Sequence, residues 1–348
     1  MAPTNTAAYL TSEKSPLTIS SAPYTSPSSS QLVIRTHALA INPVDWAIQS
    51  LGSALFPWLT YPKVIGSDIA GEVVEIGSAT TRFKVGDRVV ALAAGLTTDA
   101  SQSAFQEYVV VAENMTSPIP DSLAYENAAV LPLGISTAAS GLFQKDFLAL
   151  QHPTFPARPS TGETLLIWGG ATSVGANAVQ LAVAAGYEVI STSSPKNFDF
   201  VRSLGASEVF DYNSATVTKE ILAAVKGKKM AGAMAIGGLD PATTVVVARA
   251  CLDVVKGSEG RKFVTMAVRF DEKEVPEGVE AKFVFGSGLK DNEVGPAIFE
   301  HFLPKALVEE GYRAVPEPFV GGKGLEGIEG AFEVSKKGVS AKKVVVSL

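Results

Sequence analysis

The chain has 348 residues, of which 46% are hydrophobic, and its formal net charge at pH 7 is −6. This length predicts two domains, and the mild acidity argues against nucleic acid as a partner. Polar residues or glycines interrupt every apolar run before the roughly 18 residues that a membrane span needs, and no secretory signal opens the sequence. We therefore expect a cytoplasmic protein without membrane partners.

A metal site is not expected. Zinc sites take several Cys or His ligands, whereas this chain offers one cysteine, Cys251, and three histidines that are far apart in sequence, His37, His152 and His301. We interpret each histidine as a packed or solvated side chain. The single cysteine also excludes an internal disulfide bond.

Residues 1–125 have the pattern of a β-rich domain. Stretches rich in β-branched residues are separated by clusters of Gly, Pro, Asp and Ser, as in short antiparallel strands of a barrel-like or sandwich fold. Gly77 and Gly86 bound a turn between two of these strands. The expected strands lie at 31–41, 67–77, 87–94 and 104–112.

From residue 126 to residue 290 the rhythm changes. A helical stretch and a Pro-rich surface loop, 150–163, precede a series in which strands and helices alternate. Such alternation implies parallel strands joined by right-handed crossovers, and therefore an α/β fold with a doubly wound sheet. The expected strands are 164–168, 188–194, 208–212, 230–238, 262–267 and 281–288, and the expected helices are 173–186, 197–205, 216–227 and 241–257.

The last stretch begins near residue 291. Residues 292–311 and 324–338 predict helices and 341–348 a strand, with no further α/β unit recognised there. We expect the chain to return to the first domain, so that 126–290 is inserted into a domain made of 1–125 and 291–348.

The stretch TLLIWGGATSVGANAVQL, residues 164–181, is typical of a dinucleotide-binding turn. A buried strand leads into two glycines, and the N-terminus of the helix that follows favours an anion. Gly170 suits the tight turn and Gly175 the close packing of helix on strand, but Thr172 replaces the central glycine of the fingerprint. Thr172 and Ser173 then offer hydroxyls to a pyrophosphate. A tight turn without a ligand is the alternative.

The next strand indicates which dinucleotide is bound. NAD calls for Asp or Glu at the end of this strand, but Glu188 stands at its beginning. The end carries Ser191–Ser194, followed by Lys196 and Asn197, which suit the 2′-phosphate of NADPH. Tyr212, at the end of the third strand, is a candidate to flank the same phosphate or the adenine. An ordinary polar loop is the alternative.

A set of motifs spreads over nearly the whole chain. They are NPVDW (42–46), YPKVIGSDIAGEVVEIG (61–77), FKVGDRV (83–89), LPLGISTAASGLF (131–143), LLIWGGATSVGANAVQLA (165–182), LGASEVFDY (204–212) and GLEGIEGAFEVSKKGVSAKKVVV (324–346). With these motifs the chain resembles the medium-chain dehydrogenase/reductase superfamily. It is most similar to the zinc-free branch of quinone oxidoreductases and enoyl reductases, particularly the fungal trans-acting enoyl reductases of polyketide assembly.

The resemblance implies a GroES-like catalytic domain, a Rossmann domain and an active site in the cleft between them. Where zinc-dependent relatives carry a cysteine and a histidine, this chain has Asn42, Asp45 and Asp68, so no metal ligands are assigned. Many relatives have a lysine where this chain has Ala47, which argues against a lysine-based acid catalyst here.

The resemblance also assigns site residues. At the cofactor these are Val44, Asp45 and Thr137 near the nicotinamide, Thr172, Ser173, Val174 and Gly175 at the pyrophosphate, Ser194, Lys196, Asn197 and Tyr212 at the 2′-phosphate, and Lys343 and Val344 on the far side. Around the substrate they are Gly134, Ile135, Ser136, Phe285, Gly286 and Ser287.

The expected chemistry is NADPH-dependent reduction of an activated C=C bond. An enone or enoyl thioester accepts hydride at its β-carbon, and hydrogen-bond donors stabilise the enolate oxygen that develops. Asn42 and Thr137 are the candidate catalytic donors, with Ser136 beside them. Alternatively, Asn42 only caps the turn before Pro43, and Ser136 and Thr137 merely lie near the cofactor.

The substrate is expected to be a small molecule, and a polyketide synthase carrier domain is a candidate partner. Relatives occur as monomers and as homodimers. Competing functions are quinone reduction, zinc-free carbonyl reduction, and NADPH binding without turnover in a regulatory or structural protein.

Overall fold

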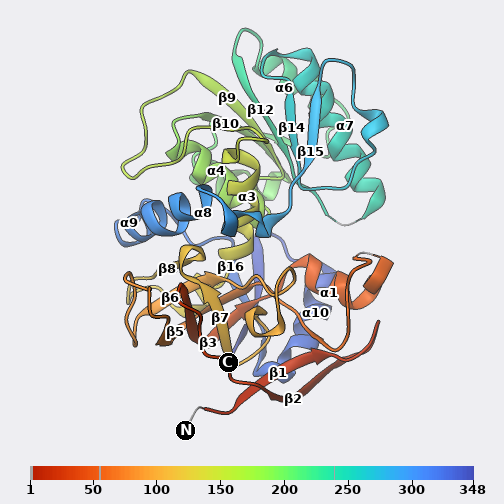
Figure 1. Cartoon of the computed structure of the whole chain (residues 1–348). Coiled ribbons are helices and arrows are strands. Elements are labelled where there is room, and N and C mark those ends of the chain that lie inside the picture. Colours follow the sequence, from red (N-terminus) through yellow and green to blue (C-terminus); the bar gives the residue numbers. More distant parts are fainter. Residues whose placement is uncertain (1–2, 55, 239) are drawn as a thin grey trace. The chain divides into compact units, whose positions relative to one another are not determined.

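The computed structural model describes residues 3–54, 56–238 and 240–348 (Figure 1). The chain divides into two compact units, Met1–Leu133 with Arg313–Leu348, and Gly134–Tyr312. These divisions fall later than the expected boundaries at 125 and 290. The second boundary shifts because the segment before Arg313 packs within the second unit, where Phe299, Leu303 and Tyr312 are buried.

The first unit contains two sheets, as its β-rich sequence predicted. In the larger sheet the strand order is β16-β17-β3-β5-β6-β8, and β7 also pairs with β3; the smaller sheet has the order β2-β1-β4. The strands β5 and β6 pair antiparallel around the predicted turn. The strands are β1 (Asn5–Leu10), β2 (Leu17–Ala22), β3 (Gln31–Ala40), β4 (Lys63–Val64), β5 (Asp68–Ile76), β6 (Arg88–Leu92), β7 (Tyr108–Ala112), β8 (Thr116–Pro118), β16 (Glu317–Lys323) and β17 (Lys342–Ser347).

Helices α1 (Pro43–Leu51) and α10 (Ile328–Lys337) cover the core of this unit, and α2 (Tyr125–Ala128) is a single turn. Leu39 and Ile69 from the sheet share one buried cluster with Ile48 of α1 and Phe332 of α10. Burial of these side chains is the main term that holds the strands and helices together.

The C-terminal strand joins the first unit, because β17 pairs antiparallel with β3. The expectation that no further α/β unit forms there was wrong. Strand β16 pairs parallel with β17 and is connected to it through α10, which makes a β–α–β unit. The sequence of β16 hides this unit, since Gly321 and Gly322 interrupt an exposed strand.

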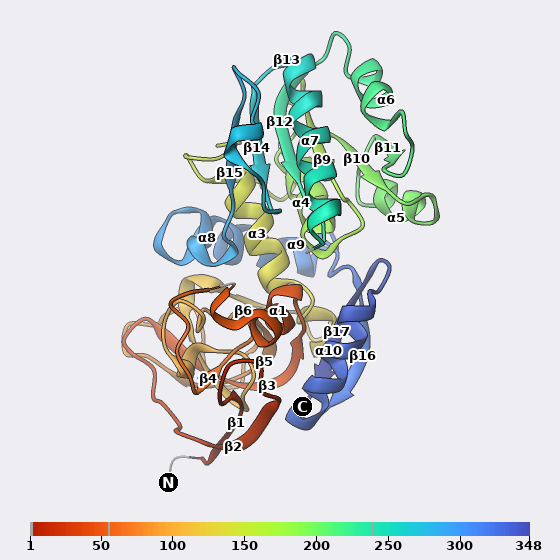
Figure 2. The same cartoon turned by 90° about the vertical axis from the view of Figure 1, so that its right-hand side faces the viewer.

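The second unit contains the predicted doubly wound sheet. Its order is β11-β10-β9-β12-β14-β15, with β13 beside β12, and the pairs are parallel. Figures 1 and 2 show α6 and α7 on one side of this sheet and α3 and α4 on the other. The strands are β9 (Glu163–Trp168), β10 (Glu188–Ser193), β11 (Glu208–Asp211), β12 (Lys229–Ala235), β13 (Glu259–Gly260), β14 (Phe263–Met266) and β15 (Glu280–Phe283). The helices are α3 (Pro132–Phe143), which begins in the first unit, α4 (Ser173–Ala184), α5 (Phe198–Ser203), α6 (Val217–Ala224), α7 (Pro241–Gly257), α8 (Val294–Pro296) and α9 (Leu303–Val308).

Two predicted elements differ near the end of the second unit. The strand expected at 281–288 ends at Phe283, and a 3₁₀ helix, Gly286–Asp291, follows it. The helix expected at 292–311 is continuous over residues 294–308, but its middle turn, Ala297–Phe302, is π-helical between α8 and α9. Pro304 fits this change of pattern, because proline lacks the N–H that an α-helical hydrogen bond to residue 300 would need.

Among the described residues, no helix combines the length and apolar character that crossing a membrane requires.

Candidate functional site

The turn after β9 is so tight that two of its positions require glycine. Gly169 has φ +86°, a conformation that favours glycine, and a Cβ added at Gly175 would lie 2.1 Å from the carbonyl oxygen of Gly169. The left-handed residue is therefore Gly169, not Gly170. Gly170 instead avoids a collision, since its Cβ would lie 2.2 Å from Ser191 Oγ.

The two hydroxyls of this turn have different surroundings. Thr172 is the N-cap of α4; its Oγ1 donates to the carbonyl of Gly169 at 2.8 Å and accepts from the N–H of Gly175 at 3.0 Å. Ser173 Oγ is buried and has no hydrogen-bond partner among the described residues. An unpaired buried hydroxyl at a helix N-terminus fits a phosphate oxygen as its missing partner.

The end of β10 brings together the residues predicted at the 2′-phosphate. The side chain of Asn197 donates to Ser194 Oγ at 3.2 Å, and the exposed Lys196 has no ion-pair partner in the described part of the chain. Tyr212 directly follows β11, the neighbouring strand, and is 43% exposed. Ser193 Oγ, one of the hydroxyls that the sequence predicts at this end of the strand, is buried there without a partner among the described residues.

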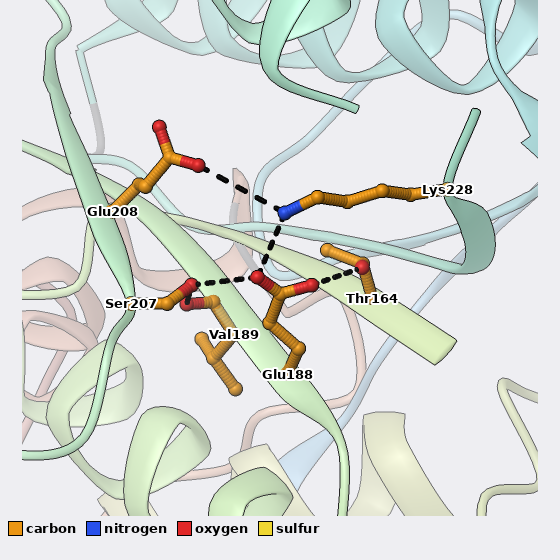
Figure 3. Close-up of polar contacts among 6 residues, drawn as sticks. All are labelled: Thr164, Glu188, Val189, Ser207, Glu208 and Lys228. Atoms are coloured by element: carbon orange, nitrogen blue, oxygen red, sulfur yellow. Dashed lines mark hydrogen bonds and ion pairs between the residues drawn. The ribbon is translucent and has the colours of Figure 1, made fainter. Parts of the chain in front are cut away.

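Glu188 lies at the opposite end of β10, as the sequence indicated (Figure 3). Its carboxylate accepts from Lys228 Nζ at 2.7 Å, Thr164 Oγ1 at 2.6 Å and Ser207 Oγ at 3.2 Å. Burial raises the pKa of Glu188, but the hydrogen bonds from Lys228 and Thr164 outweigh it and lower the pKa overall. This carboxylate is committed to a structural ion pair.

Helix α3 presents the residues predicted around the substrate in different ways. Ile135 and Ser136 are fully buried, and the Ser136 hydroxyl donates to the carbonyl of Gly286. Thr137 is half-buried, and no partner of its hydroxyl is found among the described residues. Gly134 runs close to α4, because a Cβ there would lie 2.6 Å from Ser173 Oγ.

Ser136 therefore ties α3 to the segment after β15, in which Phe285 is 37% exposed and Ser287 is half-buried. The strand conformation expected for Phe285, Gly286 and Ser287 is not observed, because the 3₁₀ helix begins at Gly286. Of the hydroxyls on α3 named by the sequence, only that of Thr137 remains available to a ligand within the described chain.

In the first unit, Asn42, Asp45, Asp68 and Lys343 form one buried polar cluster. Lys343 Nζ lies 3.1 Å from Asp68 Oδ2 and also donates to Asn42 Oδ1, while Asn42 Nδ2 donates to Asp68 at 2.9 Å. The other oxygen of Asp68 accepts from the N–H of Leu133, in the first turn of α3, at 2.6 Å. These four residues come from motifs that are far apart in the sequence.

Asp45 accepts from the N–H of Asn42 at 2.7 Å and is fully buried. Burial raises the pKa of Asp45 to about 7, against the opposing hydrogen bond from Asn42. Asn42 uses its amide oxygen and one amide N–H within the cluster, which leaves one amide hydrogen. The side chains of Asp45 and Lys343 are occupied by these contacts rather than open to a ligand.

Two further predicted positions are apolar. Val344 is 2% exposed and belongs to the core, where its carbonyl accepts from Ile41, and Val44 packs against the same core. Ala47, which replaces the lysine of many relatives, is completely buried.

No three His, Cys, Asp or Glu side chains gather into a possible metal site within residues 3–54, 56–238 and 240–348. Cys251 is buried, and burial raises the pKa of its thiol strongly, which makes it inert. His37 stacks on Tyr125 at a ring distance of 4.6 Å.

Comparison with known proteins shows the family to which the chain belongs. Residues 28–121 match the alcohol dehydrogenase GroES-like domain. The chain is 53% identical to the dehydrogenase azaJ of Aspergillus niger, with 99% of each chain covered. It belongs to the medium-chain dehydrogenase/reductase superfamily.

Two other members of this superfamily widen the comparison. The chain is 38% identical to the trans-enoyl reductase himH of Aspergillus japonicus, over 91% of this chain and 90% of that one. An alcohol dehydrogenase superfamily protein from Novosphingobium aromaticivorans has the same fold, with a TM-score of 0.77, 22% identity and 99% of each chain covered. The chain is therefore an oxidoreductase of the medium-chain type. Another solved structure with this fold, 22% identical and with a TM-score of 0.70, is an NAD-dependent alcohol dehydrogenase.

Proposed function

We propose that this oxidoreductase uses NADPH and, without zinc, reduces the activated C=C bond of an enone or enoyl thioester. The observation that carries the cofactor preference is the end of β10. Ser194 and Asn197 are hydrogen-bonded there, and Lys196 beside them has no ion-pair partner among the described residues, whereas Glu188 is held in an ion pair at the other end of the strand. A cation and hydroxyls favour a 2′-phosphate, which a carboxylate would repel.

The pyrophosphate is assigned to the first turn of α4. The N–H of Gly175 already donates to Thr172 Oγ1. We therefore assign the contacts with the pyrophosphate to Ser173 Oγ and to the N–H groups of Ser173 and Val174. Glycine at positions 134 and 175 keeps side chains out of this turn. These observations support a nicotinamide dinucleotide as the ligand.

When bound, NADPH supplies the hydride. Thr137 donates a hydrogen bond to the substrate oxygen on which negative charge develops, since its hydroxyl has no partner among the described residues. Asn42 is reassigned as a positioning residue because Lys343 and Asp68 hold its amide on both sides. Val44, Asp45, Lys343 and Val344 are engaged in packing and hydrogen bonding within the first unit rather than open as ligands.

Hydrogen bonding of this kind suits a conjugated acceptor, because its charge develops on an oxygen remote from the carbon that is attacked. The exposed ring of Phe285 provides an apolar surface for an acyl chain. The name of the relative himH, a trans-enoyl reductase, supports an enoyl group as the substrate. We assign this group to a thioester, with the carrier domain of a polyketide synthase as the candidate partner.

The test is a substrate panel with protein treated with a zinc chelator. NADPH consumption is followed at 340 nm with enones, enoyl thioesters, 1,4-quinones and aldehydes. We expect turnover of enones or enoyl thioesters that exceeds turnover of quinones and aldehydes. Faster turnover of quinones would assign the protein to quinone reduction, and turnover that appears only after zinc is restored would contradict the proposal.

A further inference from the structure

A buried chain of hydrogen bonds leads from the end of the second unit to the first turn of α4. Tyr312 donates through its hydroxyl to Asn177 Oδ1, and Asn177 Nδ2 donates to the carbonyl of Ser173 at 2.8 Å. Asn177 is fully buried and Tyr312 is 3% exposed. The chain stops at Ser173, whose hydroxyl has no partner among the described residues.

Tyr312 is itself fixed from several directions. Its ring packs edge-on against Phe302, with ring centres 5.6 Å apart, and its N–H donates to the carbonyl of Ala306 at 3.0 Å. Gly311 lies so close to Phe155 that a Cβ at 311 would be 1.9 Å from the ring. Burial keeps the pKa of Tyr312 well above its usual value, so the hydroxyl stays protonated and remains a donor.

The hydrogen bond from Asn177 holds Ser173, the residue to which we assign the contact with the pyrophosphate. In a helix the carbonyl of residue 173 is already the acceptor for the N–H of residue 177, and the Asn177 side chain adds a second bond to it. Gly134 packs from the other side, since a Cβ there would lie 2.6 Å from Ser173 Oγ and 2.9 Å from Asn177 Nδ2. The turn is held from two directions while one hydroxyl is left unpaired.

We propose that Tyr312 and Asn177 are positioning residues that hold Ser173 in place for the pyrophosphate of the cofactor. This inference rests on the proposed binding of NADPH to the first turn of α4. It assigns a role to a tyrosine that is remote in sequence from the glycine turn and is linked to it through Asn177. A purely structural tyrosine would stabilise the unit without favouring one part of a nucleotide over another.

The test compares two nucleotides on Tyr312→Phe. NADPH contains the pyrophosphate, whereas 2′-AMP carries the adenosine and 2′-phosphate without it. We expect the Kd for NADPH to rise roughly tenfold, the loss of about one well-placed hydrogen bond, while the Kd for 2′-AMP stays unchanged. Thr265→Val is the matched control, because it removes another buried hydroxyl bond of the same unit, to the carbonyl of Gly141 at 3.0 Å, and should leave both constants unchanged.

Asn177→Ala serves as a second variant, because it removes both links of the chain, to Tyr312 and to the carbonyl of Ser173, and should weaken NADPH alone. Wild-type affinity for NADPH in Tyr312→Phe, or in Asn177→Ala if Tyr312→Phe does not fold, overturns the inference and leaves the proposed function intact. Equal weakening of both nucleotides in Tyr312→Phe also overturns it, since the role would then be general. A wild-type protein that binds neither nucleotide overturns the proposed function and the inference together.

Discussion

Lys342 and Lys343 are neighbours in β17, but replacing each with methionine should have very different effects. Lys343 is 5% exposed and lies 3.1 Å from Asp68, which is completely buried. Lys343→Met leaves that carboxylate buried, with the Asn42 amide and the Leu133 N–H as its remaining partners in the described part of the chain. Breaking a buried pair in this way costs about 3–5 kcal/mol, which lowers the melting temperature of a unit of this size by roughly 10 °C.

Lys342 provides the matched control. It pairs with Glu317 at the surface, with side-chain exposures of 42% and 65%, and such pairs contribute at most about 1 kcal/mol. Thermal denaturation followed by circular dichroism compares the two variants. Adding Asp68→Asn to Lys343→Met should restore part of the loss, because the buried charge is removed while an acceptor for Leu133 remains. Equal melting temperatures for the two single variants would refute the reasoning.

Three further predictions concern pH, cofactor and substrate. Because burial raises the pKa of Asp45 to about 7 from 3.8, against the Asn42 hydrogen bond, the folded chain keeps a proton that the unfolded chain has lost, and stability falls as pH rises from about 4 to 7. Asp45→Asn removes this pH-dependent contribution to stability. The urea midpoint of wild-type unfolding should therefore fall relative to that of the variant between pH 5 and 8, and a difference between the two midpoints that does not change with pH would contradict this prediction. Lys196→Ala should weaken NADPH about tenfold in fluorescence titrations and leave NADH unchanged, since only NADPH has the 2′-phosphate; equal weakening of both would exclude this role. Thr137→Val should lower kcat for an enone about 100–1000-fold at an unchanged Kd for NADPH, and an unaltered kcat would remove Thr137 from the reaction.

The sequence predicted the regular strands and helices of the fold better than its irregular segments. The parallel sheet followed from alternating apolar strands and amphipathic helices, because both periodicities are local. Strand β16 was missed since its glycines and exposed side chains give no alternation. The segment at 292–311 has a helical pattern, and it contains a π-helical turn just before Pro304. The spacing of apolar residues predicts a helix but does not show where a proline lacks the N–H for an α-helical hydrogen bond.

The sequence predicted the location of the segments that form the candidate site, but not the hydrogen-bonding role of each side chain. The turn at 169–175 and the polar end of β10 lie where the sequence indicated. Thr172 and Ser173 carry the same functional group, and only the backbone geometry shows that the first caps the helix while the second stays unpaired. The partnership of Lys343 with Asp68 depends on the pairing of strands distant in sequence, which no local pattern contains.

The central claim is most directly tested by a parallel titration of the protein with NADPH and NADH. Tryptophan fluorescence is a suitable signal, because Trp168 is buried at the end of β9, directly before the glycine turn. We predict much tighter binding of NADPH than of NADH, with the difference lost in Lys196→Ala. Equal affinities for the two cofactors would contradict the assignment of the β10 end to a 2′-phosphate, and absence of binding would contradict the reductase itself.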